Sequence, residues 1–305
     1  MGLGYQGRLY ILAFDHRASF SRGMFGIEGE PTAEQTKQIA DAKLLIYEGL
    51  VAATESGEVA AGDVGVLVDE QFGGEVPRLA RERGMVLAMS VEKSGQKLFD
   101  FEYGDGFGEH IDRFDPYFSK VLVRYNPEDD AGANRVQLGR LKRLADWLHE
   151  RDHRFLFEML VPATDDQLGR VNGDERRYEA ELRPGLIARG IAEAQEFGVE
   201  VDVWKLEGVD STADAEALVR QARSGDGREG VVCVLLGAGA DDHRVESWLG
   251  VVGATEGFSG FAIGRSIWRE PLRASLAGEI DRDEAANRIA QDYLRFVRVY
   301  ERAAS

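Results

Sequence analysis

Short runs of apolar residues recur along the chain, and they lack the polar alternation of a strand that has one face in water. Such runs are typical of parallel strands that are buried on both faces. There are eight of them, at residues 9–14, 64–69, 85–91, 118–125, 155–161, 201–206, 231–236 and 258–263. We therefore expect eight buried strands.

Amphipathic stretches separate these runs. After Thr32, apolar residues recur at spacings of three and four, the period of a helix with one buried face, and Gln35 stands where it completes a capping box with Thr32. Similar stripes run through residues 138–148 and, near the end of the chain, 289–300. The strands thus alternate with helices.

This alternation over 305 residues favours an α/β fold, a single (β/α)8 TIM barrel that spans residues 1–305. A doubly wound open sheet would show the same alternation. However, no strand is followed by a G-x-G-x-x-G turn or a P-loop pattern, and no Pro-, Gly- or Ser-rich linker divides the chain. The glycine-rich residues 104–108 and the acidic residues 128–132 each follow a strand, so we expect both as loops over the barrel mouth.

Composition and charge exclude some partners. Lys and Arg number 37 against 54 Asp and Glu, a net charge of −17, whereas nucleic-acid-binding proteins present a basic surface. The only cysteine, Cys233, excludes an intrachain disulfide and a cysteine-based metal site. The apolar stretch before Asp15 is too short for a signal peptide, and no run is long enough to span a membrane. We expect a cytoplasmic protein, with no nucleic-acid or membrane partner, that could self-associate.

In six predicted strands, ionisable residues stand within the apolar run or at its C-terminal end, where apolar side chains would be expected. Burying a charge without a partner costs several kcal/mol, so such residues are rare unless they are paired or used in chemistry. The catalytic groups of barrel enzymes lie at this end of the strands. From the first strand to the sixth, the residues are Asp15, His16 and Arg17; Asp69 and Glu70; Glu92 and Lys93; Lys120 and Arg124; Glu158; and Lys205.

Lys205 is the strongest catalytic candidate among them, because the chain has only seven lysines and arginine supplies most of its positive charge. A lysine that is desolvated near a second cation loses part of its proton affinity, and its neutral amine can attack a ketone to form a Schiff base. Lys120 would be that cation. Alternatively, Lys205 forms a structural ion pair with Glu158 or Asp15, and these carboxylates can also cap helices. We interpret His16 as a local hydrogen-bond partner.

Two glycine-containing turns predict a phosphate site. Gly237 and Gly239 follow the seventh strand, and Gly264 and Arg265 follow the eighth. Barrels often hold phosphate on backbone amides of these two loops, and Arg265 would add a bidentate contact. Glycines after strands are also ordinary turn residues. A phosphate site would need a local cationic pocket, because the overall charge repels anions.

The histidines do not predict a metal site. A metal centre needs ligands grouped at the strand ends. No two of the five histidines stand together at strand ends, where they could act as a pair of metal ligands. These histidines are His16, His110, His149, His153 and His243. We therefore expect no metal and no other cofactor.

Asp15, Lys120, Glu158 and Lys205, on strands one, four, five and six, resemble the site of a class I, Schiff-base aldolase. The sequence is most similar to the 5-dehydro-2-deoxyphosphogluconate aldolase-like family of inositol catabolism, a relative of tagatose-bisphosphate and sulfofructose-phosphate aldolases. The resemblance spans nearly the whole chain. It rests on LAFDHR at residues 12–17, VEKSG at 91–95 with FDFEYG at 99–104, WKLEG at 204–208 and GFAIGR at 260–265.

The resemblance implies a role for each site residue. Lys205 would be the Schiff-base lysine, Glu158 the acid/base, and Lys120 and Asp15 the polar pair around the reacting carbons. Arg265 would hold the phosphate together with Gly237, Gly239 and Gly264. Lys93 would bind the part of the substrate that differs between subfamilies, such as a carboxylate. Arg17 and Arg124 are further candidates for substrate binding.

We therefore predict reversible, metal-free aldol cleavage of a phosphorylated keto-sugar or keto-acid. The first choice is 5-dehydro-2-deoxygluconate 6-phosphate, cleaved to dihydroxyacetone phosphate and malonate semialdehyde. One alternative is a sister aldolase that acts on tagatose bisphosphate or a sulfosugar phosphate. The others are a metal-dependent lyase or hydrolase on the same barrel, which the histidines disfavour, and a non-catalytic barrel that binds a sugar phosphate.

Overall fold

The computed structural model describes residues 2–305 and contains a closed barrel of eight parallel strands in chain order. The strands are β1 (Leu9–Ala13), β2 (Val64–Val68), β3 (Val86–Ser90), β4 (Phe118–Arg124), β5 (Arg154–Leu160), β6 (Val203–Glu207), β7 (Val232–Leu236) and β8 (Phe258–Ile263). Every predicted strand overlaps one of these and differs from it by at most two residues at either end. The predicted (β/α)8 barrel is confirmed.

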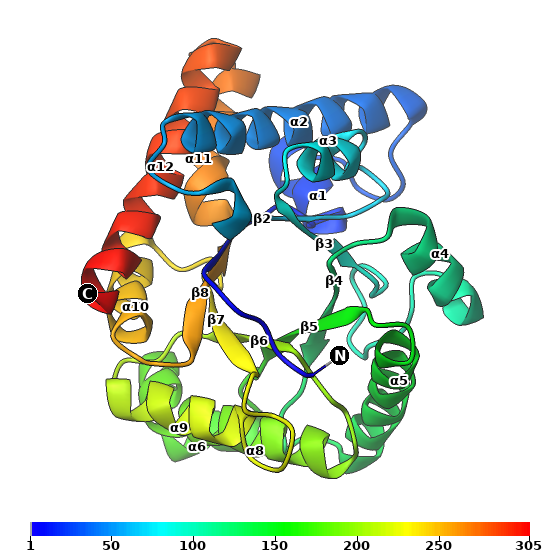
Figure 1. The fold of residues 1–305 in the computed structure, drawn as a ribbon, viewed down its shortest axis with the longest axis vertical. Coiled ribbons are helices and arrows are strands. Elements are labelled where there is room, and N and C mark those ends of the chain that lie inside the picture. The colour runs from blue at the N-terminus through cyan, green and yellow to red at the C-terminus, as the bar shows by residue number, and fades with distance from the viewer. Residues whose placement is uncertain (1) are drawn as a thin grey trace.

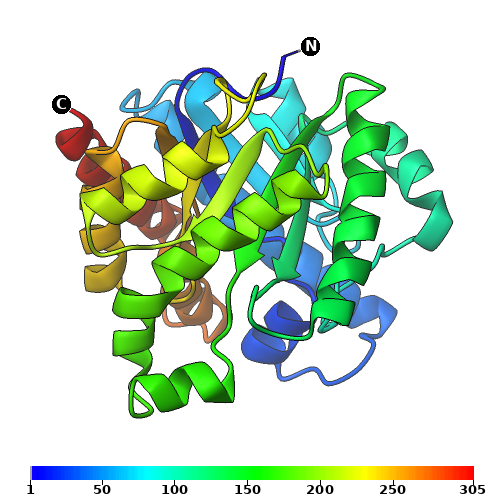
Figure 2. The same ribbon diagram turned by 90° about the horizontal axis from the view of Figure 1, so that it is seen from below.

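Helices form an outer ring around the strands, as the view down the barrel shows (Figure 1) and the view from the side repeats (Figure 2). The helices are α1 (Ala18–Phe25), α2 (Ala33–Glu55), α3 (Val76–Glu82), α4 (Phe107–Phe114), α5 (Ala131–His149), α6 (Asp165–Arg170), α7 (Glu175–Arg177), α8 (Arg183–Glu196), α9 (Thr212–Ala222), α10 (Asp242–Gly253), α11 (Arg265–Leu276) and α12 (Arg282–Ala304). Further helical turns are the 3-10 turns η1 (Ala61–Asp63) and η2 (Gly104–Gly106) and the π-helical turn η3 (Tyr178–Leu182). The last helix, α12, packs against α2 and α10, so the end of the chain completes the ring.

The predicted helices form where the apolar stripes placed them. Thr32 is the N-cap of α2, and the capping box with Gln35 is present in both directions. The stripe of α5 is buried from Leu138 to Leu148, and that of α12 from Ile289 to Tyr300. Within residues 2–305, no helix combines the length and the apolar character that a membrane crossing requires.

Side chains along each strand alternate between the barrel interior and the helix layer. Inside the barrel, Phe118, Leu156 and Val203 of β4, β5 and β6 belong to a buried apolar cluster. Two residues further along these strands, on the same side, come Lys120, Glu158 and Lys205. The charged residues therefore form a layer directly above an apolar floor.

The prediction that residues 104–108 lie over the barrel mouth is wrong. Gly104–Gly106 form a turn that leads directly into α4, and the Phe107 ring stacks on Phe101 with 4.3 Å between ring centroids. This aromatic packing holds the segment on the outer wall. The segment at the barrel mouth is instead the stretch between β3 and Gly104, in which Glu92 and Phe101 form an antiparallel bridge. Residues 128–130 form the turn before α5, where Asp130 caps the helix, and residues 131 and 132 are the first two residues of that helix.

Candidate active site

A cavity of about 510 Å³ opens at the C-terminal ends of the barrel strands. The structure brings every residue predicted for the site to this one cavity. The residues that line it include Asp15, Arg17, Lys93, Lys120, Arg124, Glu158, Lys205, Gly237, Gly239, Gly264 and Arg265. Their common location supports a single site, and the role of each residue stays a prediction.

The cavity gathers positive charge in an acidic chain. Seven basic and four acidic side chains line it, although the whole chain carries a net charge of −17. Within residues 2–305, four of the basic groups form no ion pair and are available to an anionic ligand: Lys93, Lys97, Arg124 and Arg265. This is the local cationic pocket that a phosphate site in such a chain needs.

Lys205, Glu158 and Lys120 form a contiguous cluster at the base of the cavity. The Glu158 Oε2 atom lies 3.0 Å from Nζ of Lys205 and 2.9 Å from Nζ of Lys120. The Lys120 ammonium also donates to Oδ2 of Asp15 at 2.7 Å and to Oε1 of Glu92 at 3.0 Å. The side chains of Lys205 and Lys120 are only 3% and 1% exposed, so water screens these contacts weakly.

Burial and neighbouring charges act against each other in this cluster. Burial alone would raise the pKa of Asp15 and of Glu158, but Lys120 and Lys205 outweigh it and lower the pKa of both carboxyls. Burial alone would lower the pKa of Lys120, yet the carboxylates of Asp15, Glu158 and Glu92 hold it well above the usual value. At neutral pH, therefore, Lys120 is a cation and both Asp15 and Glu158 are ionised.

The position of Lys205 fits both interpretations made from the sequence. Its contact with Glu158 is the ion pair that a structural role would require. Lys205 also lines the cavity, beside a carboxylate that can accept its proton and near a second cation, Lys120. Such an arrangement can activate an amine for attack on a carbonyl carbon. Catalysis by Lys205 stays a prediction.

The start of α11 and the loop after β7 form one corner of the cavity. Space requires glycine at Gly264, where a Cβ would lie 2.0 Å from the Ala13 carbonyl oxygen, and a Cβ at Gly239 would lie 2.6 Å from Nη2 of Arg265 and displace that guanidinium. Gly239 also has φ +74°, which favours glycine. The glycines thus let the backbone and the Arg265 guanidinium come close together, at a helix N-terminus suited to anions.

Arg17 lines the cavity, but protein groups already engage its guanidinium. Its Nη1 lies 2.9 Å from Oε2 of Glu102, and its Nη2 donates to the Glu92 carbonyl oxygen at 2.5 Å. The side chain is 6% exposed, and its Nε is buried without a partner in the described chain. These contacts favour a bracing role for Arg17 over the substrate contact predicted from sequence. Lys93 and Arg124 are exposed, as substrate-binding groups would be.

Glu92 is a cavity residue that the sequence analysis did not select for the site. One carboxylate oxygen, Oε1, accepts from Lys120, and within residues 2–305 the other, Oε2, is buried without a partner. Burial raises the pKa of Glu92 despite the charges of Lys120 and Arg17. Its position directly after a predicted strand could have indicated a site residue. However, the sequence pattern could not decide whether the side chain of Glu92 or that of Lys93 faces the cavity.

His16 also lines the cavity. Burial lowers its pKa to about 4, so the imidazole is neutral at pH 7. The hydrogen bond expected for it is missing at Nδ1, which has no partner within residues 2–305. His16 is therefore a neutral polar group that faces the same cavity as Asp15.

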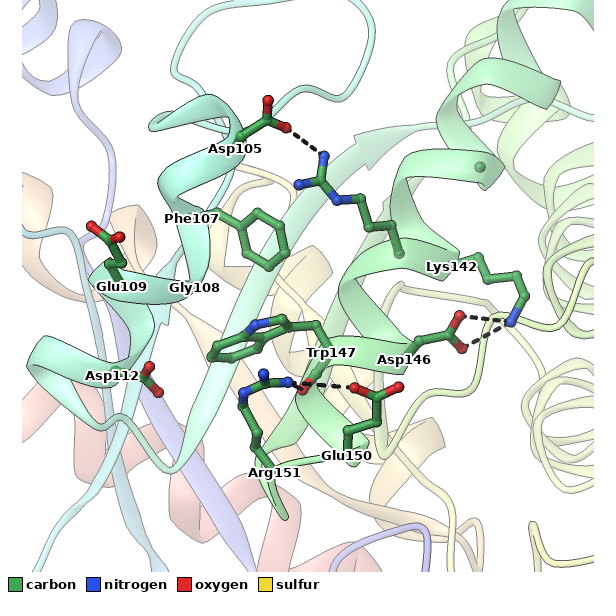
Figure 3. A pocket seen from close by; sticks show the side chains of 12 residues that line it. Asp105, Phe107, Gly108, Glu109, Asp112, Lys142, Asp146, Trp147, Glu150 and Arg151 are labelled. Atoms are coloured by element: carbon green, nitrogen blue, oxygen red, sulfur yellow. Dashed lines mark hydrogen bonds and ion pairs between the residues drawn. The ribbon is translucent and has the colours of Figure 1, made fainter.

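A second hollow, of about 580 Å³, lies on the outer wall between α4 and α5 (Figure 3). Its basic groups are paired with acidic neighbours: Arg143 with Asp105 at 2.7 Å and Lys142 with Asp146 at 2.8 Å. No residue predicted for the site lines it. We therefore place the candidate site in the barrel mouth. Among residues 2–305, no three His, Cys, Asp or Glu side chains are grouped so that they could hold a metal ion.

Comparisons with known proteins identify the family of this chain and several relatives. A family model described as "Uncharacterized protein conserved in bacteria (DUF2090)" matches residues 4–304. Proteins named tagatose 1,6-diphosphate aldolase, from Listeria monocytogenes serotype 4a and Listeria innocua serovar 6a, are each 27% identical over 215 residues. The match covers 66% of this chain and 56% of each relative, so the chain spans little more than half the length of these relatives.

Solved structures share the fold at low sequence identity. A fructose-bisphosphate aldolase from Plasmodium falciparum, solved with TRAP and an inhibitor, is 16% identical with a TM-score of 0.65, over 98% of this chain and 91% of that one. A Corynebacterium glutamicum protein is 17% identical with a TM-score of 0.58, over 97% and 88%. At these identities the similarity supports the barrel fold.

Proposed function

This chain belongs to the DUF2090 family, and from that premise we propose that it is a class I aldolase that cleaves a phosphorylated keto-sugar or keto-acid through a Schiff base on Lys205. One observation carries the proposal: Lys205 and Lys120 share the Oε2 atom of Glu158 at the base of a cation-lined cavity. The similarity to tagatose 1,6-diphosphate aldolases supports the same class of reaction.

In the first half of the proposed reaction, Lys205 becomes attached to the substrate. Lys205 gives a proton to Oε2 of Glu158, 3.0 Å away, and its neutral amine attacks the ketone carbon. Glu158 returns the proton to the hydroxyl of the carbinolamine, which leaves as water, and an iminium joins Nζ to the substrate carbon. Lys120, which stays a cation, stabilises the oxyanion that develops during the attack.

In the second half, the carbon–carbon bond that separates the two product halves breaks. Asp15 or Glu158 accepts the proton of the hydroxyl on the departing carbon, which becomes the aldehyde. The bonding electrons pass to the iminium and form an enamine. Protonation of the enamine carbon, followed by addition of water to the iminium, releases the phosphorylated ketone and restores the amine of Lys205. Both carboxylates can act as bases because both are ionised at neutral pH.

The first-choice substrate is 5-dehydro-2-deoxygluconate 6-phosphate, which would yield dihydroxyacetone phosphate and malonate semialdehyde. The resemblance stated above supports this choice, and it would place the protein in inositol catabolism in the cytoplasm. The phosphate would lie against Arg265 and the start of α11, and the free cations at the cavity wall favour a multiply charged anion. No metal or cofactor takes part in this scheme.

Two alternatives have an observation in their favour. The relatives named tagatose 1,6-diphosphate aldolase favour a ketose bisphosphate as substrate, and a panel of phosphorylated ketoses would distinguish these substrates. The Lys205–Glu158 ion pair is also compatible with a non-catalytic barrel that binds a sugar phosphate. Tight binding of such a ligand with no turnover would identify that case.

The decisive experiment is reductive trapping. The protein is treated with dihydroxyacetone phosphate and sodium borohydride, and the modified peptide is identified by mass spectrometry. We expect a secondary-amine adduct on Lys205 that is absent in Lys205→Met. Lys142→Met, on the outer wall, is the matched control and should be trapped as wild type is. The mechanism is excluded if the native protein gives no adduct, or gives one only on another lysine.

A further inference from the structure

The segment that follows β3 folds back on itself at the cavity wall. Lys93 N donates to the Asp100 carbonyl oxygen at 2.9 Å, and Glu102 N donates to that of Val91 at 3.0 Å. We call residues 91–102 the β3 hairpin. Its residues from Glu92 to Lys97 line the cavity, so it forms part of the wall and carries two of the unpaired cations, Lys93 and Lys97.

Arg17 and Glu102 hold the stem of this hairpin. Arg17 reaches from the end of β1 and binds Glu102 Oε2 at 2.9 Å and the Glu92 carbonyl oxygen at 2.5 Å. Oε2 of Glu102 also accepts from the backbone N–H of Ser94 at 3.1 Å. One arginine thus ties together both strands of the hairpin, and Glu102 fixes the backbone next to Lys93.

The other side of the hairpin is fixed by α5 and β4. Phe99 N donates to Oε1 of Gln137 at 2.7 Å, and Arg140 donates to the Phe99 carbonyl oxygen at 2.6 Å. Arg124, at the end of β4, donates to the Gln96 carbonyl oxygen at 3.3 Å. The hairpin is therefore a braced element, and Lys93, Lys97 and Arg124 are brought to one part of the cavity wall.

The barrel order places this wall opposite the proposed phosphate corner. The closed barrel runs from β1 to β8, so β3 and β4 lie four strands away from β7 and β8, and β6 with Lys205 lies between β4 and β8. A ketone whose phosphate is bound by Arg265 and whose carbonyl meets Lys205 would direct its other end towards the β3 hairpin. In an aldol reaction, that end is the aldehyde half.

We propose that the β3 hairpin is the anion subsite for the aldehyde half of the substrate, with Lys93 and Lys97 as its ligands and with Arg17 and Glu102 as the positioning residues that hold it. This inference rests on the proposed aldolase function. The group it would bind is a carboxylate or a phosphate at the far end of the aldehyde. Arg17 acts here through the hairpin and does not touch the substrate.

The test uses the condensation direction, in which dihydroxyacetone phosphate is the common donor. The acceptors are glyceraldehyde, which is neutral, malonate semialdehyde, which carries a carboxylate, and glyceraldehyde 3-phosphate. We expect the native protein to prefer at least one charged acceptor over the neutral one by about tenfold or more in kcat/KM, because hydrogen bonds to charged groups contribute that much. Which charged acceptor is preferred identifies the group that the hairpin binds.

In Lys93→Met/Lys97→Met this preference should fall about tenfold, as it would after the loss of one charged contact. Arg17→Met and the milder Glu102→Gln should lower it too, through a higher KM for the charged acceptor rather than a lower kcat. The controls are Lys142→Met and Arg143→Met, and both should keep the native preference. In the native protein these side chains form ion pairs on the outer wall, Lys142 with Asp146 and Arg143 with Asp105.

Trapping of dihydroxyacetone phosphate by borohydride is measured in parallel on every variant. An unchanged acceptor preference in the lysine double variant, with trapping intact, would overturn the subsite. A native protein with no preference for either charged acceptor would also overturn it. If Glu102→Gln lowers kcat for all acceptors alike and also lowers trapping, Glu102 has a merely structural role. That result would overturn the positioning claim. Failure of the native protein to be trapped would instead remove the proposed function itself.

Discussion

Glu158 and Lys205 are register partners on the neighbouring strands β5 and β6, and their Oε2 and Nζ atoms lie 3.0 Å apart. Pairing of the strands fixes both backbones, so this contact does not depend on a mobile loop. The same oxygen lies 2.9 Å from Nζ of Lys120 on β4. One carboxylate oxygen on β5 therefore contacts two ammonium groups, one from β4 and one from β6.

Replacing Glu158 by Gln tests this shared oxygen. Gln keeps the shape of the side chain and can still accept a hydrogen bond, but it cannot take the proton of Lys205. We expect the rate of borohydride trapping with dihydroxyacetone phosphate to fall by about 10²–10⁴, the usual contribution of a general acid or base. Glu193→Gln, which changes a carboxylate on α8 that binds Tyr125, is the control. Native trapping rates in Glu158→Gln would assign the proton transfer to another group.

Removing Lys120 should move the acid limb of the pH profile. In the native protein, Lys120 keeps the pKa of Asp15 and Glu158 below their ordinary values, so both stay ionised well into the acid range. In Lys120→Met the strongest of the charges that lower these pKa values is removed, so the pKa of both carboxyls rises. Because the proposed base must be ionised, the acid limb of kcat/KM should move to higher pH by about one to three units.

Lys120→Arg is the charge control for this measurement. The guanidinium retains the positive charge but has a different shape, so kcat should fall while the acid limb stays near its native position. An acid limb that stays in place in Lys120→Met would mean that neither carboxylate controls the reaction. The same carboxylates contribute stability that is present above their unfolded pKa, near 4, and is lost as the pH falls through their lower folded pKa.

Much of the fold and part of the site could be predicted from sequence, because the relevant rules are local. Parallel strands buried on both faces leave continuous apolar runs, and all strands of a barrel end on the same side. Lys120, Glu158 and Lys205 interrupt such runs, so the pattern alone placed them together. Lys93, Lys97, Lys120 and Lys205, four of the seven lysines, line the cavity, which agrees with the weight given to lysine usage.

The rest depends on contacts between distant residues. Arg17 is paired with Glu102, which is 85 positions away, and no local sequence pattern predicts an ion pair between such distant residues. Glu92 lies just beyond β3, where the strand period no longer applies and the hairpin sets the direction of each side chain. Residues 104–108 look like a loop by composition, but packing of Phe107 on Phe101 makes them the start of a helix.

Removal of one partner from a buried ion pair behind the site should destabilise the protein. Lys43 of α2 and Asp69, after β2, form an ion pair with exposures of 0% and 1%. Lys43 also donates to the His16 carbonyl oxygen at 2.9 Å, next to Asp15. Lys43→Met would leave the Asp69 charge buried without its partner, and we expect a loss of about 3–5 kcal/mol in the free energy of unfolding, measured with urea.

A double variant distinguishes the pair from either residue alone. Lys43→Met with Asp69→Asn removes both charges, so the loss should be clearly smaller than the sum of the two single losses. Arg298→Met, which breaks an exposed pair with Glu58, should change the unfolding midpoint little. If Lys43→Met and Arg298→Met lowered the free energy of unfolding equally, the larger contribution expected for the buried pair would be contradicted.

Gly239→Ala tests the phosphate corner through the backbone. The new methyl would lie 2.6 Å from Nη2 of Arg265, at a residue with φ +74°, so either the loop or the guanidinium must move. Because a charged hydrogen bond contributes about 1.5–3 kcal/mol, affinity for dihydroxyacetone phosphate should fall by roughly ten- to a hundredfold. Borohydride trapping of unphosphorylated dihydroxyacetone should change much less, since that donor does not use Arg265.

The comparison of the two donors separates a lost phosphate contact from general damage to the site. A misfolded variant would lose both donors equally, whereas displacement of Arg265 weakens only the phosphorylated one. Gly139→Ala, in α5 with no heavy atom within 4 Å of the added methyl, is the matched control and should bind both donors as the native protein does. If Gly239→Ala keeps native affinity for dihydroxyacetone phosphate, the phosphate must be held elsewhere, and the opposite cationic wall formed by Lys93, Lys97 and Arg124 becomes the position to test.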